Sequence, residues 1–153
     1  MSLQEMMSLG HVACRYNATS KKQLLQHLAD MAAANCSVPS RAILDAIMKR
    51  EKLGNTGIGR GIAIPHALIE GLEEDIVLLA TLDKSLCFDA SDRRDVDIIC
   101  MVLGPMGASS SHLTTVGLAA RLLGMNADDI RQAISAEELL ASVRLAQQNS
   151  AAA

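Results

Sequence analysis

A histidine in the first half of the chain has a sequence context that suits a reactive side chain. His66 follows a short apolar run that ends in Pro65, and residues 54–61 just before that run contain four glycines. Because proline fixes its own φ angle and has no N–H donor, the backbone next to His66 is expected to be rigid. A neutral imidazole held there can act as a nucleophile. From the residue types alone, His66 is either such a reactive group or an ordinary surface histidine.

His112 and Arg50 are two further candidates for chemistry. His112 is predicted in the first turn of a helix, after three serines at 109–111. Free backbone N–H groups and the helix dipole favour an anion there and disfavour a protonated imidazole. We therefore expect a neutral His112 that donates one hydrogen bond. Arg50 ends a predicted helix, and its guanidinium either binds a phosphoryl group or is a solvated charge at the helix C-terminus.

Several other classes of function are disfavoured by motif and composition. The glycine-rich segment 54–61 lacks the Lys-Ser/Thr ending of a P-loop, so nucleotide binding by that route is not supported. With 14 basic and 17 acidic residues, one Phe, one Tyr and no Trp, the chain has neither the charge nor the aromatic residues for nucleic-acid binding. A metal site built from His66, His112 and a cysteine would lack the short ligand spacing of known sites, and the four cysteines are expected to be reduced.

The hydrophobic pattern predicts the elements that position these residues. Residues 76–82 and 96–103 are nearly continuous apolar runs, which is typical of strands buried on both faces. Shorter strands are predicted at 11–16 and 62–64, with a loop at 54–61 and a short strand or bulge at 88–89. Helices are predicted at 21–35, 39–51, 111–123 and 126–134, and a last helix begins after Ser135.

This order predicts one α/β (α+β) domain over residues 1–153, with a frayed tail at 148–153. Neighbouring strands in the middle of the chain imply some antiparallel pairing, so we expect a three-layer α/β/α sandwich around a mixed sheet. The chain has no apolar run of 18 residues and no signal-peptide pattern, which predicts a cytoplasmic protein that is not embedded in a membrane.

One long stretch resembles a known family. Residues 50–66 (REKLGNTGIGRGIAIPH) closely resemble the phosphorylation-site motif of phosphotransferase-system enzyme IIA domains of the fructose, mannitol and nitrogen-regulatory type. The resemblance continues through 88–92, 96–105 and His112, and so covers nearly the whole chain. Two positions depart from the family pattern. Ala67-Leu68 replaces the Gly-Lys that often follows this histidine in the nitrogen-regulatory group, and Gly104-Pro105 stands where an apolar residue and a proline are usual.

The resemblance implies a mixed sheet flanked by helices and a role for each candidate. His66 is then the phosphorylated residue, His112 the second histidine of the active site, and Arg50 the nearby basic residue. For the phosphoryl group itself we also expect Thr56 and Ser111 as ligands. The donor is expected to be a histidine phosphocarrier protein, and no metal or nucleotide cofactor is required.

Two functions are compatible with such a phosphoryl-transfer protein. The first is regulation of target proteins by the phosphorylation state, as in the nitrogen-regulatory type, and we favour it because no transporter domain is attached. The second is relay of the phosphoryl group to the acceptor domain of a fructose or mannitol permease.

Overall fold

Six strands form one mixed sheet in the computed structural model, which describes residues 7, 9–88 and 94–152. The strands are β1 (Val12–Tyr16), β2 (Gly57–Gly59), β3 (Ile62–Ala63), β4 (His66–Ile69), β5 (Ile76–Leu86) and β6 (Val96–Pro105). Their order across the sheet is β1-β5-β6-β3-β2, and β4 pairs with β6 as well. β5 and β6 are antiparallel, whereas β1 is parallel to β5, and β3 and β4 are parallel to β6.

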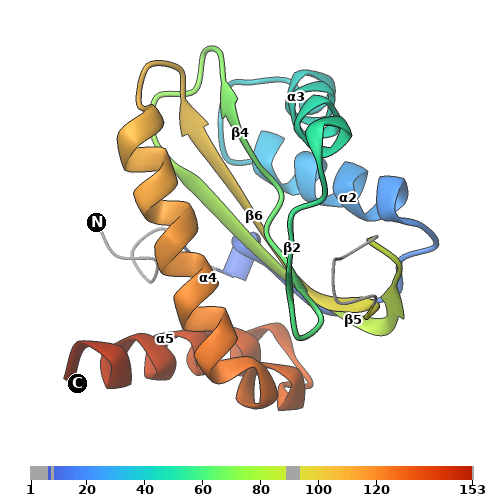
Figure 1. Cartoon of the computed structure of the whole chain (residues 1–153), viewed down its shortest axis with the longest axis vertical. Coiled ribbons are helices and arrows are strands. Elements are labelled where there is room, and N and C mark those ends of the chain that lie inside the picture. The colour runs from blue at the N-terminus through green and yellow to red at the C-terminus, as the bar shows by residue number, and fades with distance from the viewer. Residues whose placement is uncertain (1–6, 8, 89–93, 153) are drawn as a thin grey trace.

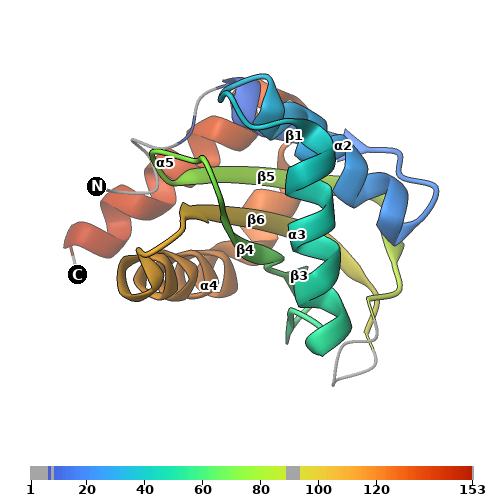
Figure 2. The same ribbon diagram turned by 90° about the horizontal axis from the view of Figure 1, so that it is seen from above.

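Helices cover both faces of this sheet. They are α2 (Lys21–Ala33), α3 (Ser40–Leu53), α4 (Ser109–Gln132) and α5 (Ala136–Ala152), and a single 3₁₀ turn, η1 (Leu9–His11), precedes β1. α2 and α3 pack on one face, and α4 and α5 pack on the other (Figures 1 and 2). The predicted three-layer arrangement around a mixed sheet is confirmed. None of the described helices combines the length and the apolar character needed to cross a bilayer.

The two long strands divide the hydrophobic core into two halves. Successive residues of a strand point to opposite faces. Leu78 and Ala80 of β5 accordingly join the cluster under α2 and α3, and Val77 and Leu79 join the cluster under α4 and α5. The prediction that both apolar runs are strands buried on two faces is confirmed, although β5 extends four residues beyond the predicted end at residue 82.

Two of the four described α-helices, α2 and α5, are capped by the serines that the sequence predicts. Ser20 Oγ accepts the N–H of Gln23 at the start of α2, and Ser135 Oγ accepts the N–H of Glu138 at the start of α5. The two helices predicted at 111–123 and 126–134 together form α4, and the predicted break between them is a kink where Asn126 leaves helical geometry. α4 also begins at Ser109 with Ala108 as its N-cap, so the three serines lie inside the first turn.

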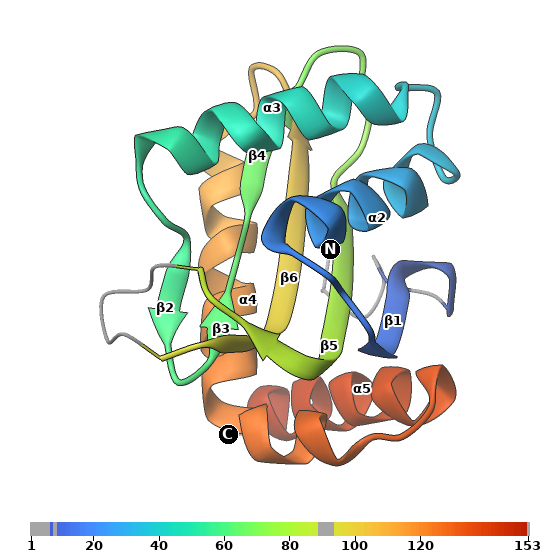
Figure 3. The same ribbon diagram turned by 90° about the vertical axis from the view of Figure 1, so that its right-hand side faces the viewer.

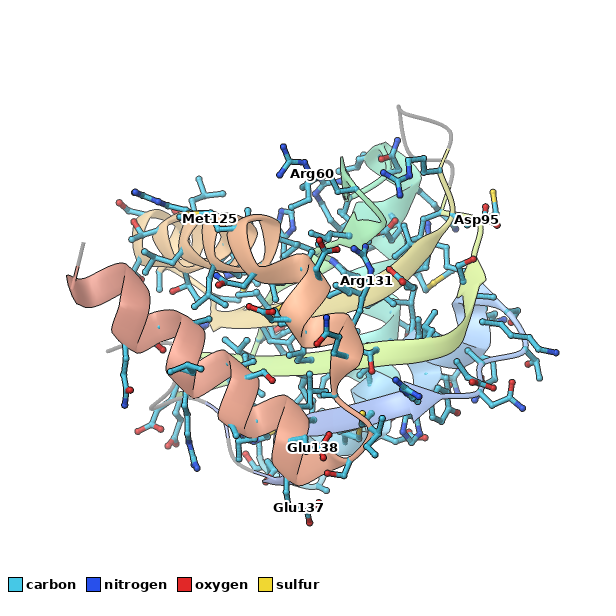
Figure 4. All side chains as sticks on the ribbon, turned by 90° about the horizontal axis from the view of Figure 1, so that it is seen from below. Arg60, Asp95, Met125, Arg131, Glu137 and Glu138 are labelled. Carbon is cyan, nitrogen blue, oxygen red and sulfur yellow. The ribbon has the colours of Figure 1, made fainter. Side chains whose placement is uncertain are left out.

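The glycine-rich segment is not wholly a loop, as the sequence predicted, because it contains a tight hairpin. β2 pairs antiparallel with β3, and the two residues between them, Arg60 and Gly61, have φ angles of 59° and 78°. Two positive φ angles define the type I′ turn that suits the twist of a hairpin. Arg131 of α4 fixes this turn, because its guanidinium donates to both carboxylate oxygens of Asp97 and to the carbonyl of Arg60. Arg131 and Arg60 are labelled in Figure 4.

A strand that the sequence did not predict begins at His66. β4 runs parallel to β6, with His66 opposite Val102 and Ala67 opposite Leu103. β3 lies along the same strand, with Ala63 opposite Ile99, so Ile64 and Pro65 interrupt what is otherwise one continuous register. The predicted strand or bulge at 88–89 falls partly outside the described residues, as do 89–92 of the family-like segment 88–92. The 148–152 segment, predicted as frayed, is the last part of α5.

Candidate active site

The backbone next to His66 determines which nitrogen of its ring carries a proton. His66 Nδ1 lies 2.8 Å from the carbonyl oxygen of Ile64. A carbonyl can only accept a hydrogen bond, so Nδ1 carries the hydrogen and the lone pair remains on Nε2. Pro65, the residue between Ile64 and His66, is held to β6, because its carbonyl accepts the N–H of Val102 at 2.9 Å. His66 is therefore a half-buried imidazole with a fixed tautomer and a nucleophilic Nε2.

His112 approaches His66 from helix α4, which packs behind β4 and β6 (Figure 3). The two ring centroids are 5.6 Å apart with a 48° angle between the planes. His112 is only 4% exposed, and within the described residues neither of its ring nitrogens has a hydrogen-bond partner. A buried polar side chain without a partner is uncommon and calls for an explanation. Its nitrogens are available to a group that arrives at His66.

The charge state of His112 follows from its burial. Loss of hydration lowers the pKa of His112, the neighbouring His66 lowers it further, and the carboxylate of Asp75 opposes both effects. The ring is therefore neutral near pH 7 in the unphosphorylated protein, as the sequence predicted. Burial is the main cause, whereas the prediction rested on the helix dipole.

Arg50 lies beside the residues that follow His66. Its Nη1 donates to the carbonyl of Gly54 at 3.0 Å, which stabilises the C-terminal end of α3. The same side chain lines an open cavity of about 1070 Å³ together with Ala67, Leu68 and Met106. The structure thus brings the two histidines into ring contact and places Arg50 at a cavity that borders β4.

The chain matches the family model described as "Phosphoenolpyruvate-dependent sugar phosphotransferase system, EIIA 2" over residues 5–144. It belongs to this enzyme IIA family. The family predicted from the 50–66 motif is therefore confirmed, and the chain is a phosphoryl-transfer protein of the phosphotransferase system.

Relatives of this enzyme IIA protein include both regulatory and sugar-specific members. It is 42% identical over 104 residues to a nitrogen regulatory protein of Bradyrhizobium diazoefficiens, which covers 68% of each chain. It is 32% identical over 119 residues to the PTS system fructose-specific EIIA component of Haloferax volcanii, covering 77% of each chain. The crystal structure of nitrogen regulatory protein IIA-Ntr from Neisseria meningitidis matches with a TM-score of 0.86 at 27% identity, covering 92% of this chain and 98% of that one.

The two hydroxyl groups predicted to bind the phosphoryl group have other acceptors in this enzyme IIA structure. Thr56 is 6% exposed and donates from Oγ1 to Glu51 Oε1 at 2.5 Å. Ser111 is exposed and donates to the carbonyl of Ala108 at 3.1 Å. Their role as ligands stays a prediction, and it requires each hydroxyl to exchange its present acceptor.

Two acidic residues near the site were not singled out in the sequence. Glu51 binds Lys21 Nζ at 2.7 Å as well as Thr56, and its side chain is 4% exposed. Asp75 precedes β5 and acts on His112. Glu51 is part of the 50–66 motif, but its partner Lys21 lies on another helix, and Asp75 and His112 likewise belong to different elements. Within the described residues, no group of three or more His, Cys, Asp and Glu side chains is arranged to hold a metal ion.

Proposed function

We propose that this protein accepts a phosphoryl group on Nε2 of His66 from a phosphorylated histidine of a phosphocarrier protein. The observation that best supports this is the hydrogen bond from His66 Nδ1 to the Ile64 carbonyl, since it leaves Nε2 as the nucleophile. As the bond from phosphorus to Nε2 forms, the bond from phosphorus to the donor histidine breaks and its electron pair returns to the donor ring. Because the donor is already activated, the step needs neither a metal nor a nucleotide.

Three sources of positive potential stabilise the phosphoryl oxygens in this proposal. The first amides of α4 point out of the helix N-terminus, and the N-cap residue Ala108 has no side-chain oxygen to occupy them. His112 donates one hydrogen bond, and Arg50 supplies a permanent charge from the neighbouring cavity. The sequence also predicts Thr56 and Ser111 as ligands of the phosphoryl group, and substitution of Thr56 tests the first of these.

Large exposed apolar side chains in the cavity beside Arg50 and next to His112 in the sequence support a protein as the donor. Leu53 and Met106 line the same cavity as Arg50 and are 84% and 61% exposed, and Leu113, which follows His112, is 62% exposed. Exposed apolar side chains grouped around polar ones are typical of surfaces that bind another protein. A phosphocarrier that docks on them places its phosphohistidine over His66.

The phosphorylation state is then read by other proteins. We favour a cytoplasmic regulator of the nitrogen-regulatory type, because the Bradyrhizobium and Neisseria relatives carry that name. Relay to the acceptor domain of a sugar permease is the second candidate, supported by the fructose-specific Haloferax relative. In either case the protein acts as a phosphotransferase that carries the phosphoryl group on a histidine.

The test combines the protein with a histidine phosphocarrier, the kinase that charges it, and phosphoenolpyruvate. Intact-mass spectrometry should show one added, acid-labile phosphate, which His66→Ala abolishes. His27→Gln is the matched control, because His27 stacks on Tyr16 at 4.1 Å on the opposite face of the sheet and should leave labelling unchanged. Label retained by His66→Ala would refute the assignment. Transfer from the labelled protein to a permease acceptor domain would favour the sugar-specific candidate over the regulatory one.

A further inference from the structure

Asp75 and Gly104 lie next to each other at the edge of the site, although 29 positions separate them in the sequence. In the antiparallel pairing of β5 with β6, Ile76 is opposite Leu103, so the next step of the register places Asp75 opposite Gly104. Val102 and Val77 both belong to the core cluster under α4. Because strand residues alternate between faces, Gly104 and Asp75 face α4 as well, the helix that carries His112.

Gly104 provides the space in which His112 and Asp75 approach each other. A Cβ atom on residue 104 would lie 2.7 Å from His112 Nδ1 and 3.2 Å from Asp75 Oδ1. Contact at 2.7 Å is too short for a carbon atom, so any side chain at 104 would displace His112. The absence of a side chain therefore lets an imidazole nitrogen and a carboxylate oxygen face the same small space.

Thr115 holds the carboxylate of Asp75 in this position. It is one turn after His112 on the same buried face of α4. Thr115 Oγ1 lies 3.3 Å from Asp75 Oδ2 and 3.1 Å from the carbonyl oxygen of Ser111, so its single proton is shared between two acceptors. The other oxygen, Asp75 Oδ1, lies on the Gly104 side, where a Cβ on residue 104 would also meet His112 Nδ1.

We propose that Asp75 is a positioning residue for His112 in phosphoryl transfer: when His66 carries the phosphoryl group, Asp75 accepts the Nδ1–H of His112 and His112 donates its Nε2–H to a phosphoryl oxygen. This inference rests on the proposed function of His66. A ring that donates at both nitrogens is an imidazolium, so His112 takes up one proton from solvent as the phosphoryl group arrives. The negative charges on either side, on Asp75 and on the phosphoryl group, stabilise that cation.

The charges around His112 explain why its protonation depends on phosphorylation of His66. The titratable groups that act on the ring are His66 from β4 and Asp75 from the residue before β5. In the unphosphorylated protein, burial and His66 lower the pKa of His112, and Asp75 offsets only part of that effect. The neighbour His66 disfavours a positive charge on His112, and phosphorylation turns it into a group with two negative charges. Asp75 then provides the second acceptor that the ring needs.

The first experiment tests whether Asp75 interacts with His112, and it does not require phosphoryl transfer. Nitrogen-15 and proton NMR titration of the unphosphorylated protein should show that Asp75→Asn lowers the pKa of His112, whereas Asp83→Asn, an exposed aspartate of β5, leaves it unchanged. If Asp75→Asn does not fold, Thr115→Val serves instead, because it removes the hydroxyl that orients the carboxylate. A His112 titration identical in wild type and in the variant would overturn the proposal, even if His66 is phosphorylated normally.

The second experiment measures transfer from the phosphocarrier as a function of pH. Asp75→Asn should slow transfer about tenfold, the size of effect typical of a residue that orients a functional histidine. The alkaline limb of its rate profile should move to lower pH, because the imidazolium is lost more easily, and Asp75→Glu should restore part of the rate. A uniform loss of rate with an unchanged pH profile would indicate a structural effect and contradict the proposal. A wild-type protein that is never phosphorylated would instead refute the proposed function, while the NMR result would stand.

Discussion

Replacing Thr56 by valine tests whether this buried hydroxyl supports the fold or the phosphoryl group. Thr56 Oγ1 donates to Glu51 Oε1, and Glu51 Oε2 accepts from Lys21 Nζ at 2.7 Å, with the Glu51 side chain 4% exposed. Valine keeps the shape of threonine and removes the donor. One carboxylate oxygen of Glu51 is then left without its donor from Thr56 in a site that water barely reaches.

The expected loss follows from the charged acceptor. Hydrogen bonds to charged groups contribute about 1.5–3 kcal/mol to the free energy of unfolding. In a chain of 153 residues, each kcal/mol shifts the midpoint of thermal unfolding by roughly 2–4 °C. We therefore expect Thr56→Val to lower Tm by about 3–12 °C, and Thr56→Ser, which keeps the hydroxyl, to lose less.

Two measurements distinguish the roles of Thr56. Urea unfolding gives the change in stability, and the rate of His66 phosphorylation is measured at 25 °C, where both proteins are folded. We expect lower stability, and a rate equal to that of wild type would assign the hydroxyl to the fold alone. Unchanged stability would refute the reasoning about Glu51, and a transfer rate that falls in Thr56→Val but not in Thr56→Ser would identify the hydroxyl as a ligand of the phosphoryl group.

Three further outcomes are expected from other parts of the chain. Arg50→Ala should slow phosphorylation of His66 by about 10²–10³-fold and Arg50→Lys by less, as measured in time courses with the charged phosphocarrier; an unchanged rate would mean that Arg50 only caps α3. Gly61→Ala should lower the midpoint of thermal unfolding, because a Cβ there would lie 2.7 Å from Arg131 Nη2 and the φ angle is +78°; equal Tm values would contradict this. Burial raises the pKa of the Cys100 thiol to about 12, so at pH 8 iodoacetamide should label the exposed Cys87 and spare Cys100 until the protein unfolds; rapid native labelling of Cys100 would show that its site opens.

The parts of the fold that the sequence predicts are those with local signals. The apolar runs of β5 and β6 are long enough to be recognised as strands without knowledge of their partners. Ser20 and Ser135 precede helices at the spacing that capping requires, and each makes the expected hydrogen bond. In such segments the residue types and their period determine the local structure directly.

The parts that sequence reasoning missed are stabilised by distant residues. β4 has no alternating pattern, and it is a strand because β6 offers a free edge from Val102 to Pro105. Glu51 binds Lys21 across a separation of 30 residues, and Asp75 and His112 both lie beside Gly104 only because β5, β6 and α4 converge there. Contacts of this kind depend on the assembled tertiary structure, so no window of the sequence contains them.

The interruption between β3 and β4 shows how the backbone fixes the tautomer of His66. In a regular strand, the N–H and C=O of one residue point to the same side. The Pro65 carbonyl accepts the N–H of Val102 in β6, so the backbone nitrogen of Pro65 faces β6 as well. Because proline has no N–H to donate, the hydrogen-bond ladder with β6 is broken at this residue. Ile64 then faces the other way: its N–H bonds to Thr56, and its carbonyl accepts from His66 Nδ1. The proton on Nδ1 of His66 is therefore held by the main chain between β3 and β4, which leaves the lone pair of the ring on Nε2.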